Sequence, residues 1–174
     1  MKRSLKGFTL VELVIVIAII GILSMVAVPN MVRQLGKSKY DSAQKRAESI
    51  FNTAQTVVQK YEVIDRSTRA VDQKYKDFKD GISYDTFDNS AIAKTSELYN
   101  DMKALNTHLE DGVWAIEIKD YKVTHVLYSD GEKDKYVGVY CYSSCPAHSS
   151  HANTDYDSYD RSGNIKTKWA AISP

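Results

Sequence analysis

The chain has 174 residues, a formal net charge of +1 from 23 basic and 22 acidic side chains, and 43% hydrophobic residues. This length leaves room for one compact domain beside a membrane helix. The near-zero charge excludes a general attraction to nucleic acid; a local basic patch could still bind it, but nothing in the sequence supports one.

The first segment is basic and the next is apolar. Lys2, Arg3 and Lys6 precede a stretch, Leu13 to Val32, with no charged side chain. As a helix this stretch would be about 30 Å long, which matches the hydrocarbon thickness of a bilayer. The positive-inside rule then keeps the N-terminus cytoplasmic and exports the rest. A removable signal peptide is the alternative, but SMVAVPN offers no small-x-small cleavage site.

The motif KGFTLVE, Lys6 to Glu12, stands directly before this apolar run. Over about the first 30 residues the chain resembles type IV prepilins and pseudopilins. The resemblance implies that a membrane-embedded prepilin peptidase cuts between Gly7 and Phe8, and that Phe8 is then N-methylated. Residues 1–7 would be a cleaved basic leader.

Glu12 is the one acid at the edge of the apolar run. An ionised carboxylate in hydrocarbon is expensive unless it is paired. The resemblance implies that the partner is the methylated amine of Phe8 in a neighbouring subunit, which would set the register of assembly. Alternatively, Glu12 simply lies at headgroup depth.

Gly21 and Pro29 weaken the same helix, because both residues lower helix stability. We expect the segment between them to kink or to melt on assembly. A static kink is the alternative.

The helix is expected to continue beyond the membrane segment. Residues 8–32 form its apolar half and residues 33–61 its amphipathic half, from about Phe8 to about Tyr61. One face carries apolar side chains at alternating spacings of four and three, namely Ala43, Ala47, Ile50, Ala54, Val57 and Tyr61. This face is expected to pack on a sheet.

Residues 62–112 read as a connection from helix to sheet. Ile64, Val71, Tyr75 and Phe78 could extend the stripe, but Asp65-Arg-Ser-Thr and Asp80-Gly81 favour breaks, so a short helix or a loop fits equally well. A clearer short helix places its apolar residues at Leu98, Met102, Leu105 and Leu109. Thr95 or Ser96 would cap it, and it would stop near Gly112.

Residues 113–174 contain the expected strands. VWAIEI places Trp114, Ile116 and Ile118 on one face, and KVTHVLYS and KYVGVYCYS follow after short turns. IKTKWAAI could add a fourth strand or act as a C-terminal clasp. The predicted fold is α+β, with a long N-terminal helix packed on an antiparallel sheet of three to four strands.

Cys141 and Cys145 lie close together near the C-terminus. In an exported chain a small disulfide loop is the leading interpretation, with free thiols as an alternative. A zinc site using Cys141, Cys145, His148 and His151 is a weaker alternative, because only two residues separate the cysteine pair from the histidines.

Other chemistry has little support. Asp155, Asp157 and Asp160 offer oxygen ligands but do not fit the EF-hand template, so a solvated loop is favoured over calcium. Four histidines occur without a nucleophile elbow, a phosphate loop or a carboxylate pair. We therefore expect no enzyme and no cofactor.

The sequence thus predicts a structural subunit of type IV pili. Copies would polymerise through the N-terminal helix into a surface filament for adhesion or motility. The resemblance implies as partners the prepilin peptidase, an inner-membrane platform and an assembly ATPase, with the chain anchored in the inner membrane before assembly. A minor pilin or pseudopilin of a secretion or DNA-uptake system is one alternative, and a membrane-anchored binding module is another.

Overall fold

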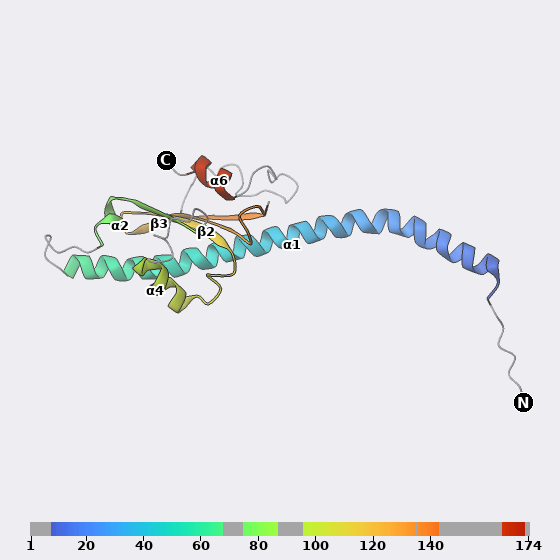
Figure 1. The fold of residues 1–174 in the computed structure, drawn as a ribbon, viewed down its shortest axis with the longest axis horizontal. Helices are drawn as coiled ribbons and strands as arrows, with labels where there is room; N and C mark the ends of the chain where they lie inside the picture. The colour runs from blue at the N-terminus through green and yellow to red at the C-terminus, as the bar shows by residue number, and fades with distance from the viewer. Residues whose placement is uncertain (1–7, 68–74, 87–95, 135, 143–164, 173–174) are drawn as a thin grey trace, which may run out of the picture. The chain divides into compact units, whose positions relative to one another are not determined.

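The computed structural model describes residues 8–67, 75–86, 96–134, 136–142 and 165–172. The chain divides into two compact units, Met1–Ser38 and Lys39–Pro174. Helix α1, Leu10–Ser67, contributes to both units and contains Pro29 (Figure 1). It begins close to the predicted start and ends six residues beyond the predicted end at Tyr61.

The second unit combines the later part of α1 with short helices and one sheet. Its helices are α2, Asp77–Asp80; α4, Glu97–Leu105; and α6, Ile165–Ile172. Its strands are β1, Ile82–Asp85; β2, Val113–Lys119; β3, Lys122–Ser129; and β4, Val137–Cys141. The fold is α+β, as predicted.

The four strands form one antiparallel sheet in the order β1-β2-β3-β4. A two-residue turn joins β2 to β3, with Asp120 and Tyr121 at φ values of 52° and 54°. Two successive left-handed residues are typical of a hairpin turn whose twist matches that of the strands. The predicted hairpins are confirmed, and each strand pairs with its neighbour along the chain.

Helix α1 packs on one face of this sheet through the predicted stripe. All six stripe residues are buried, as are Trp114, Ile116 and Ile118 of β2. Tyr61 also stacks on Tyr75, with ring centroids 4.0 Å apart. The large hydrophobic cluster between α1 and the sheet therefore forms the main core of this unit.

Two glutamines fix α1 on the sheet. Gln44 donates its amide hydrogen to the carbonyl of Val139 and accepts from the Val139 N–H at 3.0 Å. Gln55 accepts from the Val123 N–H at 2.9 Å and donates to the carbonyl of Tyr121 at 3.4 Å. The two residues are about three helical turns apart, so they lie on the same face of α1.

The backbones of α1 and β4 approach closely at Gly138. A Cβ atom built there would lie 2.6 Å from the Gln44 nitrogen and closer still to the Ala43 carbonyl. Real Cβ atoms do not tolerate such a separation. The absence of a side chain at Gly138 therefore lets the helix backbone come this near to the strand.

The other face of the sheet is covered by α6, which corrects the prediction of a fourth strand at IKTKWAAI. Figure 1 shows α6 on the side of the sheet opposite to α1. Ile165 and Trp169, one helical turn apart, pack with Ala115, Leu127 and Val137. The alternation in IKTKWAAI fits a strand, but spacing by four lets both large side chains reach the sheet together. The alternative of a C-terminal clasp agrees with this placement.

The connection also differs from its prediction at three points. The connection contains β1, which is the fourth strand of the sheet. The sequence predicted a break at Asp80-Gly81 but no strand after it. Ser96 caps α4 by accepting from the Tyr99 N–H, as expected, but the helix ends at Leu105 because Asn106 adopts an extended conformation. Leu105 is exposed, whereas Leu109 is buried in the turn that follows. Ile64 is exposed and Val71 lies outside the described residues.

A buried aspartate near the end of α1 is hydrogen-bonded to the turn between β2 and β3 and to the segment before α2. Asp65 is 1% exposed, and its carboxylate accepts from the Tyr121 hydroxyl at 2.7 Å and from the Tyr75 N–H at 3.1 Å. Each donor helps to replace water around the charge. Helix α1 ends at Ser67, within Asp65-Arg-Ser-Thr, where the sequence favours a break, and the Asp65 carboxylate anchors this last turn in the core.

Candidate functional site

The N-terminal unit exposes a continuous apolar helix. From Phe8 to Val32, every large hydrophobic side chain is between 47% and 87% exposed. The helix includes an 18-residue window with a mean hydropathy of 2.9, none of which is buried within the chain. Its length and composition are sufficient to cross a membrane. A surface of this kind needs a lipid or protein environment to cover it.

Glu12 takes part in a reciprocal cap at the start of α1. Both the N–H and the hydroxyl of Thr9 donate to Glu12 Oε2 at 2.8 Å, and the Glu12 N–H donates to Thr9 Oγ1 at 3.3 Å. This is the capping-box arrangement, in which two otherwise unpaired N–H groups of a helix end are satisfied. The described residues provide no hydrogen bond to Glu12 Oε1.

Thr9 is the functional residue that the sequence reasoning missed. The spacing Thr-x-x-Glu before an apolar run is a capping-box pattern and could have indicated it. Phe8 is exposed, while Gly7 lies outside the described residues. The cleavage bond and the methylation site therefore stay predictions.

Gly21 and Pro29 both lie within helical residues of α1. A Cβ atom at Gly21 would meet nothing within 4 Å, so no packing within the chain requires glycine there. Ser24, between them, donates its hydroxyl to the Ile20 carbonyl at 2.7 Å. Such a bond to the preceding turn favours a bend in a helix. Melting on assembly stays a prediction.

Cys141 is the last residue of β4, is buried and is disulfide-bonded. Its predicted partner, Cys145, lies outside the described residues, as do His148, His151 and the aspartates at 155, 157 and 160. The pairing of Cys141 with Cys145 thus remains a prediction. Within the described ranges, no three His, Cys, Asp or Glu side chains are grouped to hold a metal ion.

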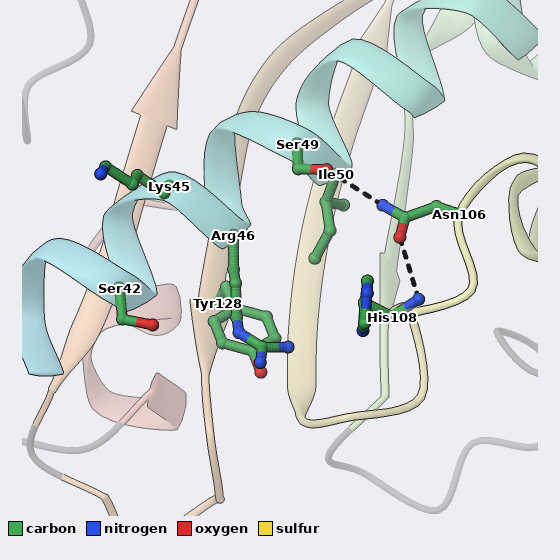
Figure 2. A pocket seen from close by; sticks show the side chains of 8 residues that line it. All are labelled: Ser42, Lys45, Arg46, Ser49, Ile50, Asn106, His108 and Tyr128. Carbon is green, nitrogen blue, oxygen red and sulfur yellow. Dashed lines mark hydrogen bonds between the residues drawn. The ribbon is translucent and has the colours of Figure 1, made fainter.

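A pocket of about 240 Å³ lies between α1, the turn after α4 and β3 (Figure 2). Asp111 links two of its lining residues, because it accepts from Arg46 at 3.0 Å and lies 2.8 Å from His108 Nδ1. Arg46 also lies over the Tyr128 ring, and Asn106 donates to Ser49 at 3.2 Å. In the described part of the chain, no hydroxyl or thiol is hydrogen-bonded to His108, so the pocket shows no nucleophile–base pair.

Comparison with known proteins bears on the N-terminal unit. A family model described as the prokaryotic N-terminal methylation motif matches residues 2–28. The chain carries the N-terminal methylation motif of type IV pilins. The matched residues include the segment from Lys6 to Glu12 and most of the exposed apolar helix.

Curated type IV pilins also align with the chain. The type IV major pilin protein PilA of Myxococcus xanthus (strain DK1622) is 35% identical over 79 residues, 45% of this chain and 31% of that protein. A type IV major fimbrial protein FimA of Dichelobacter nodosus is 38% identical over 58 residues, 33% of this chain and 37% of that protein. The chain thus aligns with about a third of the length of each relative. No solved structure gives a significant match.

Proposed function

We propose that the chain is a structural subunit of a type IV pilus, assembled through its N-terminal helix. The observation that carries this proposal is an exposed apolar helix that begins with the methylation motif. In a bilayer, lipid would cover this helix before assembly, and in a filament the helices of other copies would cover it. Burial of apolar surface supplies the cohesion in both settings.

Processing belongs to the same proposal. Cleavage between Gly7 and Phe8 would remove the basic leader and leave Phe8 as the first residue, with a free amine that is then methylated. A prepilin peptidase, an inner-membrane platform and an assembly ATPase would be the partners. The segment boundaries follow, with residues 8–32 in the filament core and the second unit displayed outside. The filament would bear load and contact surfaces, and it would perform no catalysis.

The geometry at Glu12 suggests how register would be set. Both Thr9 donors converge on Oε2, so Oε1 can accept from the amine of Phe8 in a neighbouring copy without breaking the cap. In an apolar filament core, a copy docked out of register would leave two charges unpaired. Glu12 would thus cap its own helix and select the position of the next.

The test uses cells that express the chain together with its assembly machinery. Filaments sheared from the surface are analysed by peptide mass spectrometry. The proposal requires this chain to dominate the filaments and to begin with N-methylated Phe8. A chain that keeps residues 1–7, or one that is processed but stays in the membrane fraction, would contradict it. The second of these results is the one expected of a pseudopilin.

Substitution of Glu12 tests the register mechanism separately. Glu12→Gln keeps the size of the side chain but removes its charge, and we expect filaments to be lost while cleavage at Gly7 continues. Glu48→Gln is the matched control, because Glu48 is an exposed acid on the same helix. Equal filament yield from both variants would refute the role of Glu12 in register.

A further inference from the structure

A buried histidine lies beneath α6 on the second face of the sheet. His125 of β3 is 4% exposed, and its ring centroid is 5.2 Å from that of Trp169 on α6. Its Nδ1 lies 3.0 Å from Glu117 Oε2 and 3.1 Å from Thr124 Oγ1. Its Nε2 is buried and has no hydrogen-bond partner among the described residues. Buried polar atoms without a partner are uncommon in folded proteins.

The pairing with Glu117 fixes which nitrogen carries the proton. An ionised carboxylate only accepts hydrogen bonds, so Nδ1 is the donor and Nε2 is left as a bare lone pair. Protonation of Nε2 would create a buried charged N–H that lacks an acceptor in the described structure. Burial lowers the pKa of His125 below its ordinary value, although the nearby Glu117 carboxylate partly raises it. The docked α6 therefore favours the neutral imidazole.

In the described structure, Glu117 is the acidic side chain that contacts His125. From β4, the residue in register with His125 is Cys141, which is disulfide-bonded and does not titrate. From α6, Trp169 contacts the ring, while the Lys166 ammonium lies 3.5 Å from Glu132. Among the described groups, burial under α6 and the Glu117 carboxylate thus set the balance between neutral and charged His125.

Among the described side chains, α6 contributes fewer buried apolar residues to the sheet than α1 does. Of the side chains described on α6, Ile165 and Trp169 pack on the sheet, and the Lys166–Glu132 pair is about half exposed. Exposed ion pairs contribute little to stability. The cluster under α6 is separate from the larger cluster under α1. Release of α6 would therefore leave the main core in place.

We propose that α6 is an acid-released clasp, in which protonation of His125 displaces Trp169 and α6 from the sheet. Displacement exposes the imidazolium to water and uncovers the apolar side chains of Ala115, Leu127 and Val137. Within the pH range between the pKa values of His125 in the docked and released states, each pH unit shifts the equilibrium by up to about tenfold. The proposal concerns the second unit alone, so it does not depend on pilus assembly.

Acrylamide quenching of tryptophan fluorescence tests this proposal on the full chain in detergent micelles between pH 7.5 and pH 5.0. Trp169 is covered by docking, whereas Trp114 is 1% exposed in the main core. We expect quenching to increase as the pH falls and Trp169→Phe to abolish the increase. Near-UV circular dichroism should stay native-like, because the main core persists.

Three variants separate a titration effect from simple loosening. His125→Gln should make quenching independent of pH, whether α6 is docked or released. Glu117→Gln should move the transition to higher pH, because without this carboxylate the docked state tolerates the imidazolium even less. His108→Gln, which changes an exposed histidine, should leave the transition unchanged. Constant quenching in the wild type, or an unchanged transition in His125→Gln, would overturn the proposal.

Discussion

The close approach of α1 and β4 leads to a strong prediction for Gly138→Ala. The new Cβ would lie 2.6 Å from the Gln44 nitrogen, and ordinary contact begins near 3.4 Å. The two backbones must therefore separate by at least about 0.8 Å, because the Ala43 carbonyl lies closer still. Overpacking of this kind costs about 1–3 kcal/mol, and distortion of the two Gln44 hydrogen bonds adds about 1 kcal/mol each. The free energy of unfolding should fall by about 3–5 kcal/mol.

Thermal unfolding followed by near-UV circular dichroism measures this effect on the full chain in micelles. The expected fall in Tm is about 6–20 °C. Gly131→Ala is the matched control, because a Cβ there meets nothing within 4 Å, and it should unfold close to the wild type. In the double variant Gly138→Ala with Gln44→Ala, the loss of stability should be smaller than the sum of the losses in the two single variants, because both act on the same contact. A Gly138→Ala protein as stable as Gly131→Ala would refute the reasoning.

Two other contacts lead to further predictions. Tyr121→Phe removes a hydrogen-bond donor from buried Asp65 and should lower the free energy of unfolding, measured by urea titration, by about 1–3 kcal/mol. Tyr142→Phe is the control, because Tyr142 is exposed, and it should leave the free energy of unfolding unchanged. Burial and Asp65 raise the pKa of the Tyr121 hydroxyl from 10.0 to about 12. The unfolded chain therefore loses this proton at lower pH than the folded protein, and the free energy of unfolding should fall as the pH rises above 10. An equal fall in Tyr121→Phe would argue against this cause. Thr9→Val removes the acceptor for the Glu12 N–H, so hydrogen exchange at that amide should become about fivefold faster. Thr9→Ser keeps the hydroxyl and should preserve protection. Equal exchange rates in Thr9→Val and the wild type would exclude the cap.

Long periodic patterns made much of the fold predictable. The stripe from Ala43 to Tyr61 spans several helical turns, so its period is unambiguous and all its members are buried. The strands of residues 113–141 are separated by short polar turns, and the hairpins follow from that spacing. Ser96 is a typical N-cap residue before an apolar repeat, and it caps α4.

Short or ambiguous elements were not predictable in the same way. Strand β1 has four residues, and only Ile82 and Tyr84 face inward, which is too few to define a period. The segment Ile165–Ile172 satisfies both a strand and a helix pattern, and only the second face of the sheet decides between them. A tertiary surface can override a local pattern in this way.

The candidate site, like the fold, was only partly predictable from the sequence. The positions of Phe8 and Glu12 follow from a motif, whereas the cap from Thr9 depends on where α1 begins. Gln44 and Gln55 look like ordinary polar residues beside an apolar stripe. Their role depends on peptide groups far along the chain, which no local pattern reports.

The hydrogen bonds of Gln44 also bear on how copies of this protein can join. Strand β4 is an outer strand of the sheet, and unpaired peptide groups on such a strand can recruit a strand from another molecule. The Gln44 amide occupies both the N–H and the carbonyl of Val139, as a neighbouring strand would. A foreign strand could pair there only after α1 had been lifted away. Unwanted growth by strand addition is thus blocked at this edge, and helix packing remains free to direct association.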